Sequence, residues 1–263
     1  RVGLAGVARQ LMRQRNLCVF TVVSALQVFE CTLEKNFLSF YIDLLLGDLS
    51  KHARSLLLSS AFILPWLVAL AAGPLIRRYG LKPAIAGAFV LKGFLSVVGL
   101  VLGPYHPAAV GAFAVLARVL TEAVCRVTPL VLADLVDEDR VLHRRGRSMA
   151  AMVMGASAFF TKPGESLAPI LGRLLLQRAG INPAAPASDD HAPPRTQVYM
   201  LLVAWPLLVA VLQTLVWTRY TLHGPTLAEI KAAVATDTDT EAGVELKDRE
   251  EAPAAATASF KAA

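Results

Sequence analysis

Acidic and basic side chains occur in closely spaced groups inside long apolar segments of this sequence. Glu30, Glu34 and Lys35 lie in the first apolar segment. Because Glu30 and Glu34 are four residues apart, they share one face of a helix. A charge inside a membrane is costly and therefore marks a candidate ion or solute pathway. The pathway predicted here also includes a group in the fourth apolar segment and a pair in the fifth, namely Arg118, Glu122, Arg126, Lys162 and Glu165.

Two interpretations of these charges stay open at the level of sequence. Arg118, Glu122 and Arg126 follow one another at four-residue spacing, so they form a stripe that must face a bundle interior or a wet cavity. The stripe can be a static ion-pair network, since paired charges lower each other's desolvation cost. It can also be a solute or ion pathway, because transporters place such sites at kinked helices near the midplane. Lys92 is interpreted as a packing or snorkelling lysine.

The sequence contains no pattern typical of an enzyme or of a metal centre. Neither G-x-S-x-G nor H-E-x-x-H occurs, and no apolar helix carries paired aspartates. The five histidines lie in connections or in the tail: His52, His106, His143, His191 and His223. Cys18, Cys31 and Cys125 have no metal-ligand spacing and are interpreted as small packing residues. We therefore predict no catalytic residues, no metal site and no cofactor.

The composition is that of a membrane protein. Of the 263 residues, 55% are hydrophobic and 17% are charged, whereas about 25% are charged in an average soluble domain. The mean hydropathy is +0.53. Lipid can cover an apolar surface, so we expect the bilayer to surround the chain. The net charge of +6 does not indicate nucleic-acid binding, because Lys and Arg lie at the ends of apolar runs and form no basic stripe.

Six apolar segments are long enough to cross a membrane, which takes about 20 residues. They are residues 17–46, 55–77, 83–102, 108–133, 148–176 and 197–219. The predicted fold is therefore all-α, a polytopic transmembrane helical bundle over residues 17–220. Residues 1–16 are interpreted as a lead-in or linker, and the polar residues 221–263 as a disordered tail. The first residue is Arg1, not Met, so we expect a piece of a longer chain.

Positive charges alternate between the connections. Eleven Lys or Arg residues lie in the N-terminal segment and in the second and fourth connections, against four in the first, third and fifth. The positive-inside rule therefore places the N-terminal segment and the C-terminal tail in the cytoplasm. We predict an integral multi-pass protein of the plasma membrane.

Two connections resemble the motifs of a known family. Residues 73–82 resemble the G-x-x-x-D-R-x-G-R-K loop of the major facilitator superfamily, with Ile76 near the family's acid. The residues that carry this match are Gly73, Arg77, Arg78, Gly80 and Lys82. Residues 132–139, 144–148 and 160–166 are similar to the L-A-D-x-x-D-x-D, R-R-x-G/S and K-x-x-x-S/A run of the glycoside–pentoside–hexuronide:cation symporters, the sodium–melibiose-like branch.

The resemblance implies that the chain is the six-helix C-terminal half of a twelve-helix fold. It implies a partner, the N-terminal six-helix half, which is missing from this chain. Lys162 matches a lysine near the sugar and cation site of the family. The resemblance also implies a cytoplasmic gate, in which acids pair with a basic cluster: Asp134, Asp137, Arg144, Arg145 and Arg147.

The function expected from these observations is secondary active transport of a sugar or another small organic solute by alternating access. Coupling to Na⁺ or H⁺ is the symporter-like mode that the resemblance implies. Two alternatives stay open: a surface or scaffold protein that keeps the fold without transporting, and a lysolipid transporter. The chain could also be a natural short form or an incomplete gene product, and a half of this kind would have to dimerise to alternate.

Overall fold

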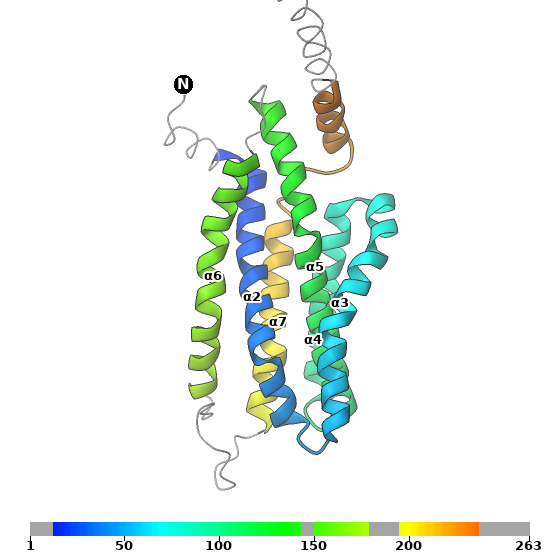
Figure 1. The fold of residues 1–263 in the computed structure, drawn as a ribbon, viewed down its shortest axis with the longest axis vertical. Coiled ribbons are helices and arrows are strands. Elements are labelled where there is room, and N and C mark those ends of the chain that lie inside the picture. Colours follow the sequence, from blue (N-terminus) through cyan, green and yellow to red (C-terminus); the bar gives the residue numbers. More distant parts are fainter. Residues whose placement is uncertain (1–12, 144–149, 179–194, 237–263) are drawn as a thin grey trace, which may run out of the picture.

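The computed structural model describes residues 13–143, 150–178 and 195–236, and long helices dominate it. They are α2 (Arg15–Leu45), α3 (Lys51–Tyr79), α4 (Leu81–Leu102), α5 (Pro107–Leu142), α6 (Ala150–Arg178) and α7 (Arg195–Trp217). Figure 1 shows them side by side in alternating directions, so that α2 begins and α7 ends at the same end of the bundle. We call this the proximal end and the opposite one the distal end. The described residues contain no strand, and the all-α prediction is confirmed.

The helices extend beyond the predicted segments where the chain leaves the apolar zone. α5 continues to Leu142, nine residues past the predicted boundary, because residues 134–142 remain helical. α3 continues to Tyr79, so Gly73, Arg77 and Arg78 belong to a helix and not to a loop as predicted. The α3–α4 connection is the single residue Gly80, at φ +88°, a conformation that only glycine adopts without strain.

Five of the six helices are long and apolar enough to span a membrane by length and composition, namely α2, α3, α4, α5 and α7. α6, the fifth of the predicted segments, falls short of this criterion, because Lys162, Pro163 and Glu165 make its middle polar. The helix is nevertheless continuous through Pro163. It lies along α2 over most of its length, as Figure 1 shows. α6 therefore belongs to the bundle through its packing against α2.

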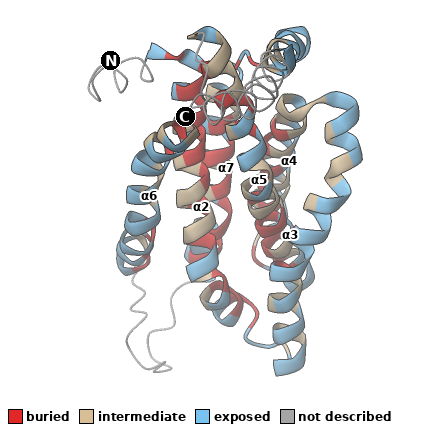
Figure 2. Cartoon of the chain, turned by 45° about the horizontal axis from the view of Figure 1, so that its top comes forward, coloured by how far each residue is buried: buried red, intermediate tan, exposed pale blue. Residues whose placement is uncertain are grey.

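The interior consists of two apolar clusters with a polar layer between them. The proximal cluster includes Leu17, Phe89 and Leu135, and the distal cluster includes Ile42 and Tyr199. α2 and α7 are the most buried parts of the bundle in Figure 2, whereas α3 and α6 are largely exposed. The exposed side chains of α3 are mostly apolar, which suits a surface that contacts lipid or another protein segment in the membrane.

Close packing of α2 against α6 depends on a glycine. A Cβ atom on Gly172 would lie 2.2 Å from Cε2 of Phe37, whereas one on Gly155 would have no atom within 4 Å. We therefore expect Gly172→Ala to destabilise the bundle by about 1–3 kcal/mol through overpacking. Gly155→Ala is the matched control and should be neutral or slightly stabilising, since alanine favours helix. Thermal unfolding of the two variants in detergent measures the difference, and equal midpoints would contradict the predicted close contact.

The beginning of the predicted disordered tail is ordered. Residues 225–236 form a helix, and Leu227 and Ile230 pack against the proximal cluster. The prediction of disorder is therefore wrong for these residues, because two apolar side chains at helical spacing find a surface to cover. Residues 237–263 lie outside the described part of the chain.

Candidate functional site

A buried polar network joins three helices in the middle of the bundle. The Lys92 amine of α4 donates to the Glu30 carboxylate of α2 and, at 2.9 Å, to Oε1 of Gln213 in α7. Nε2 of Gln213 donates to Oε1 of Gln27 at 2.6 Å. Glu30 is 0% and Lys92 1% exposed, so solvent does not reach the pair. Nε2 of Gln27 extends the network to α5 by donating to the Thr121 carbonyl at 2.6 Å.

A second network is centred on Arg118 of α5. Its Nη2 lies 2.8 Å from Oε2 of Glu122, and its Nη1 lies 3.9 Å from Oε2 of Glu34. Oε1 of Glu122 lies 2.6 Å from Nη2 of Arg126, so one carboxylate bridges two guanidinium groups. Cys31 also bonds to Glu122 and Arg118: its Sγ donates to Oε2 of Glu122 at 2.8 Å and accepts from Nη1 of Arg118 at 3.3 Å. The stripe predicted on this helix is therefore an ion-paired unit.

A cavity of about 350 Å³ opens beside this second network. We call it the central cavity. It is lined by side chains of α2, α3, α5 and α6, and the charged ones are Lys35, Arg118, Glu122, Arg126 and Glu165. Trp66 of α3 forms part of the wall, and the Arg126 guanidinium lies 3.7 Å from the centre of its ring. The stacked ring restricts the guanidinium while part of it stays exposed to the cavity.

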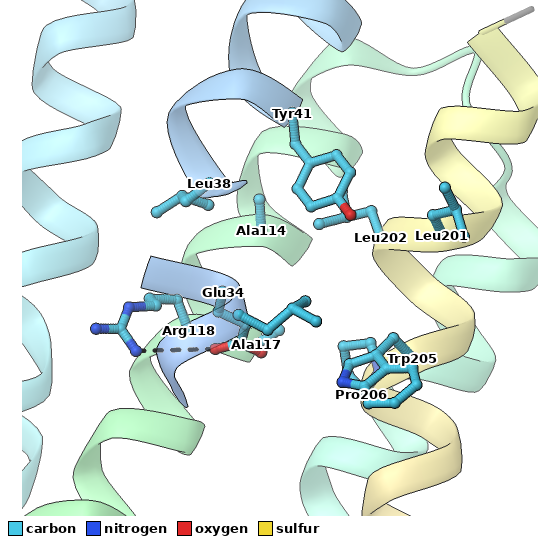
Figure 3. A pocket seen from close by; sticks show the side chains of 11 residues that line it. Glu34, Leu38, Tyr41, Ala114, Ala117, Arg118, Leu201, Leu202, Trp205 and Pro206 are labelled. Atoms are coloured by element: carbon cyan, nitrogen blue, oxygen red, sulfur yellow. Dashed lines mark ion pairs between the residues drawn. The ribbon is translucent and has the colours of Figure 1, made fainter. Parts of the chain in front are cut away.

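A second cavity of about 20 Å³ lies on the other side of Arg118. Figure 3 shows Glu34 and Tyr41 of α2, Arg118 of α5 and Trp205 of α7 around it. Such a volume holds about one water molecule. Oε2 of Glu34 and Nε1 of Trp205 are buried without a hydrogen-bond partner in the structure, so polar groups are available to bind that water. Arg118 thus lines both cavities.

The structure brings most of the predicted pathway residues together and separates Glu30 from the others. Seven of them line a cavity or pair with a residue that does. Lys162 lines neither cavity: its side chain is 71% exposed, and its amine lies 2.6 Å from Oε2 of Glu165. Glu30 instead belongs to the buried network with Lys92. The sequence pattern led to the interpretation of Lys92 as a packing or snorkelling lysine, and it did not single out Gln27 or Gln213. Isolated glutamines in apolar helices were the signal that could have found this network.

The acids predicted to form a gate lie at the proximal end, at the start of the C-terminal extension of α5. Oδ1 of Asp134 lies 2.9 Å from the Lys231 amine in helix 225–236. Asp137 lies on the same helix and is half-buried. The basic partners expected from the resemblance, Arg144, Arg145 and Arg147, lie outside the described residues.

Hydrogen bonds also join the start of α2, the C-terminal part of α5 and the segment after α7 at the proximal end. Nδ2 of Asn16 donates to Oε1 of Glu138 at 2.6 Å, and Oδ1 of Asn16 accepts from the Thr221 amide at 2.9 Å. Nε2 of Gln14 donates to Oδ1 of Asp139 at 2.6 Å. Burial, followed by the charges of Asp134 and Glu138, raises the pKa of the Tyr220 phenol far above its usual range. The proximal end is therefore closed within this half by polar contacts among α2, α5 and the segment after α7.

We expect Lys231→Glu to release helix 225–236 from the proximal end. The substitution places a carboxylate opposite Asp134, and like charges at this distance repel. The lost pair is partly exposed, so the cost should be about 0.3–1 kcal/mol, which is enough to increase fraying. Faster hydrogen exchange over residues 225–236 measures the effect. Lys51→Glu, at the distal end, is the control, and unchanged exchange in Lys231→Glu would rule out the ion pair as the anchor.

The comparison with known proteins decides the family. A family model described as "MFS/sugar transport protein" matches residues 1–224, which is most of the chain. The chain belongs to this family. Membership confirms the resemblance to the major facilitator superfamily.

Two relatives are similar over nearly the whole chain. Transmembrane protein 180 of Mus musculus is 36% identical over 253 residues, which cover 88% of this chain and 49% of the relative. Transmembrane protein 180 of Gallus gallus is 37% identical over 249 residues, with the same two coverages. The chain therefore spans about half the length of the curated relatives it matches.

Proposed function

We propose that this chain is one half of a secondary active transporter, which moves a small organic solute by alternating access coupled to Na⁺ or H⁺. The observation that carries the proposal is the central cavity. It is lined by charged side chains of α2 and α5, two helices long and apolar enough to span a membrane, where charges are too costly to keep without a role or a partner. Family membership supports transport as the general activity.

The two networks have different surroundings, and this supports different roles. Glu30 and Lys92 pair away from solvent and join α2 to α4, as expected of a static structural pair. Arg118 and Glu122 border a cavity, so a solute could reach them and exchange partners with them. We assign packing to the first network and solute or ion binding to the second.

Glu34 is the best candidate for the coupling site. Its Oε2 atom is buried, has no hydrogen-bond partner among the described residues and lies 3.9 Å from Nη1 of Arg118. Binding of H⁺ at this oxygen would remove its attraction for Arg118 and leave that guanidinium free to bind a solute in the central cavity. The Glu34 carboxylate and a solute would then compete for the same arginine, so that binding of H⁺ favours binding of the solute, which is the differential interaction that coupling requires.

The proximal end supplies the candidate inner gate. Opening the central cavity toward that end requires α5 to separate from α2 and from helix 225–236. The Asp134–Lys231, Asn16–Glu138 and Gln14–Asp139 contacts would all break in this motion. We propose that they stabilise the state closed at the cytoplasmic side, with both termini of the chain on that side and the protein in the plasma membrane.

Flux into proteoliposomes tests this function. The full-length protein that contains both halves should accumulate a solute from a panel of sugars, organic acids and lysolipids when a Na⁺ or H⁺ gradient is applied. The dependence on each gradient identifies the coupling ion, and flux of lysolipids alone would support the lysolipid alternative. Absence of flux for the whole panel, together with a co-purifying protein partner, would favour a non-transporting scaffold.

A further inference from the structure

We infer that the solute of the central cavity is a small organic anion with an apolar or aromatic body. This inference rests on the proposed function and names its substrate class. It follows from four features of the cavity: its charge, its unused hydrogen-bond donors, its aromatic wall and its size.

The central cavity carries an excess of positive charge. Three cations and two carboxylates line it, and both carboxylates already have partners. Glu122 bridges Arg118 and Arg126, and Glu165 accepts from Lys162. When Glu34 and Lys162 are added as the nearest flanking charges, four cations face three carboxylates. One cation thus lacks a counter-charge within this group.

Lys35 is that cation. It lines the cavity from α2, and no carboxylate of the described residues lies within 4.0 Å of its amine. Lys35 is an exposed residue of a helix long and apolar enough to span a membrane, where a lysine normally pairs with an acid or with backbone carbonyls. An anionic group of the solute would provide the missing partner for Lys35.

The two arginines retain donors that a carboxylate or phosphate could use. Nε of Arg118 is buried and has no acceptor in the part of the chain that the structure describes. The Arg126 side chain is 35% exposed and its guanidinium is held over the Trp66 ring, so the donors not used by Glu122 remain accessible. A planar guanidinium held in one orientation matches the two oxygens of a carboxylate or phosphate.

The wall and the volume define the rest of the solute. Phe62 and Trp66 of α3 and Val28 of α2 form an apolar wall beside the charged groups. Apolar walls with a few oriented polar groups are typical of small-molecule sites. The volume of about 350 Å³ lies near the lower end of the range for small-molecule pockets, about 300–1,000 Å³. It therefore suits a small organic acid.

A neutral sugar fits these side chains less well. Sugars are bound through many neutral hydroxyl groups, which need matched donors and acceptors. Among the lining residues, only Thr32 and Trp66 have a neutral side chain with a strong hydrogen-bonding group, and the two cysteines are weak partners. The charged groups would lose hydration on binding a neutral solute without gaining a counter-charge.

Matched pairs of ligands test the charge of the solute directly. The full-length protein in detergent is titrated with benzoate against benzamide, succinate against succinamide and phenyl phosphate against phenol, and quenching of tryptophan fluorescence is recorded. We expect at least one anion to bind about tenfold or more tightly than its neutral partner, or about 1.4 kcal/mol. Loss of the signal in Trp66→Phe would assign the binding to this cavity.

Substitution of the unpaired lysine provides the second test. Lys35→Gln should weaken binding of the preferred anion about tenfold and leave the neutral partner unaffected. Lys51→Gln removes an exposed lysine at the distal end and should change neither. The inference is wrong if no anion in the panel binds more tightly than its neutral partner, or if Lys35→Gln binds the preferred anion as tightly as the unmodified protein.

Flux of the same pairs separates this inference from the proposed function. Transport of neutral partners in preference to anions would overturn the anion class and leave transport intact. Anion binding that depends on Lys35, without flux of any solute under either gradient, would overturn transport and leave the anion site intact. Preferential flux of an anion that is lost in Lys35→Gln would support both.

Discussion

Replacement of Lys92 by methionine is expected to destabilise the bundle by about 3–5 kcal/mol, the usual cost of removing one partner from a buried ion pair. The Lys92 amine bonds to Glu30 and Gln213, and Glu30 is 0% exposed. Methionine fills a similar volume, so the cost arises mainly because the carboxylate stays buried without its cation. Unfolding in detergent with increasing SDS measures the change in free energy.

A double variant distinguishes charge burial from simple loss of packing. Glu30→Met combined with Lys92→Met should recover most of the stability, because replacing a whole buried pair by apolar groups is often nearly neutral. Lys51→Met, at an exposed site, should stay within about 0.5 kcal/mol of the original. If the double variant is as unstable as Lys92→Met, the unpaired carboxylate is not the cause.

Arg118→Lys is expected to reduce solute flux about 30-fold or more in the full-length protein, which corresponds to about 2 kcal/mol. Arg118 contacts Glu122, Cys31 and Glu34 in three directions and lines both cavities. A lysine keeps the charge but has one compact amine, so it cannot hold all these groups at once. Initial rates in proteoliposomes, normalised to the amount of inserted protein, measure the loss.

The same substitution elsewhere shows whether the effect is local. Arg219→Lys changes an exposed arginine just after α7 and should leave flux unchanged. A thermal unfolding curve for Arg118→Lys separates loss of transport from loss of folding, since a folded variant with low flux identifies a functional defect. Near-normal flux in Arg118→Lys would mean that its charge alone is sufficient and that the three-way geometry is unimportant.

Several features could be predicted because they depend on residues close in the sequence. Apolar length and the alternation of Lys and Arg gave six helices in alternating directions. The four-residue spacing placed Arg118, Glu122 and Arg126 on one face, and the structure pairs them there. Helix ends were less predictable. α5 extends past its apolar segment because the acidic residues 134–139 form hydrogen bonds and an ion pair with the start of α2 and with helix 225–236.

The sequence by itself determined the membrane class, the family and the residues that must avoid lipid. Only the tertiary structure decided which of those residues face each other. Lys92 and Glu30 are 62 positions apart, and Gln213 lies a further 121 positions along, so no local spacing could reveal that they share one network. Helix packing excludes solvent from that network, whereas it leaves Arg118, Arg126 and Lys35 beside a cavity. The physical reason is that burial depends on which helices pack together, whereas periodicity specifies only the face of each helix.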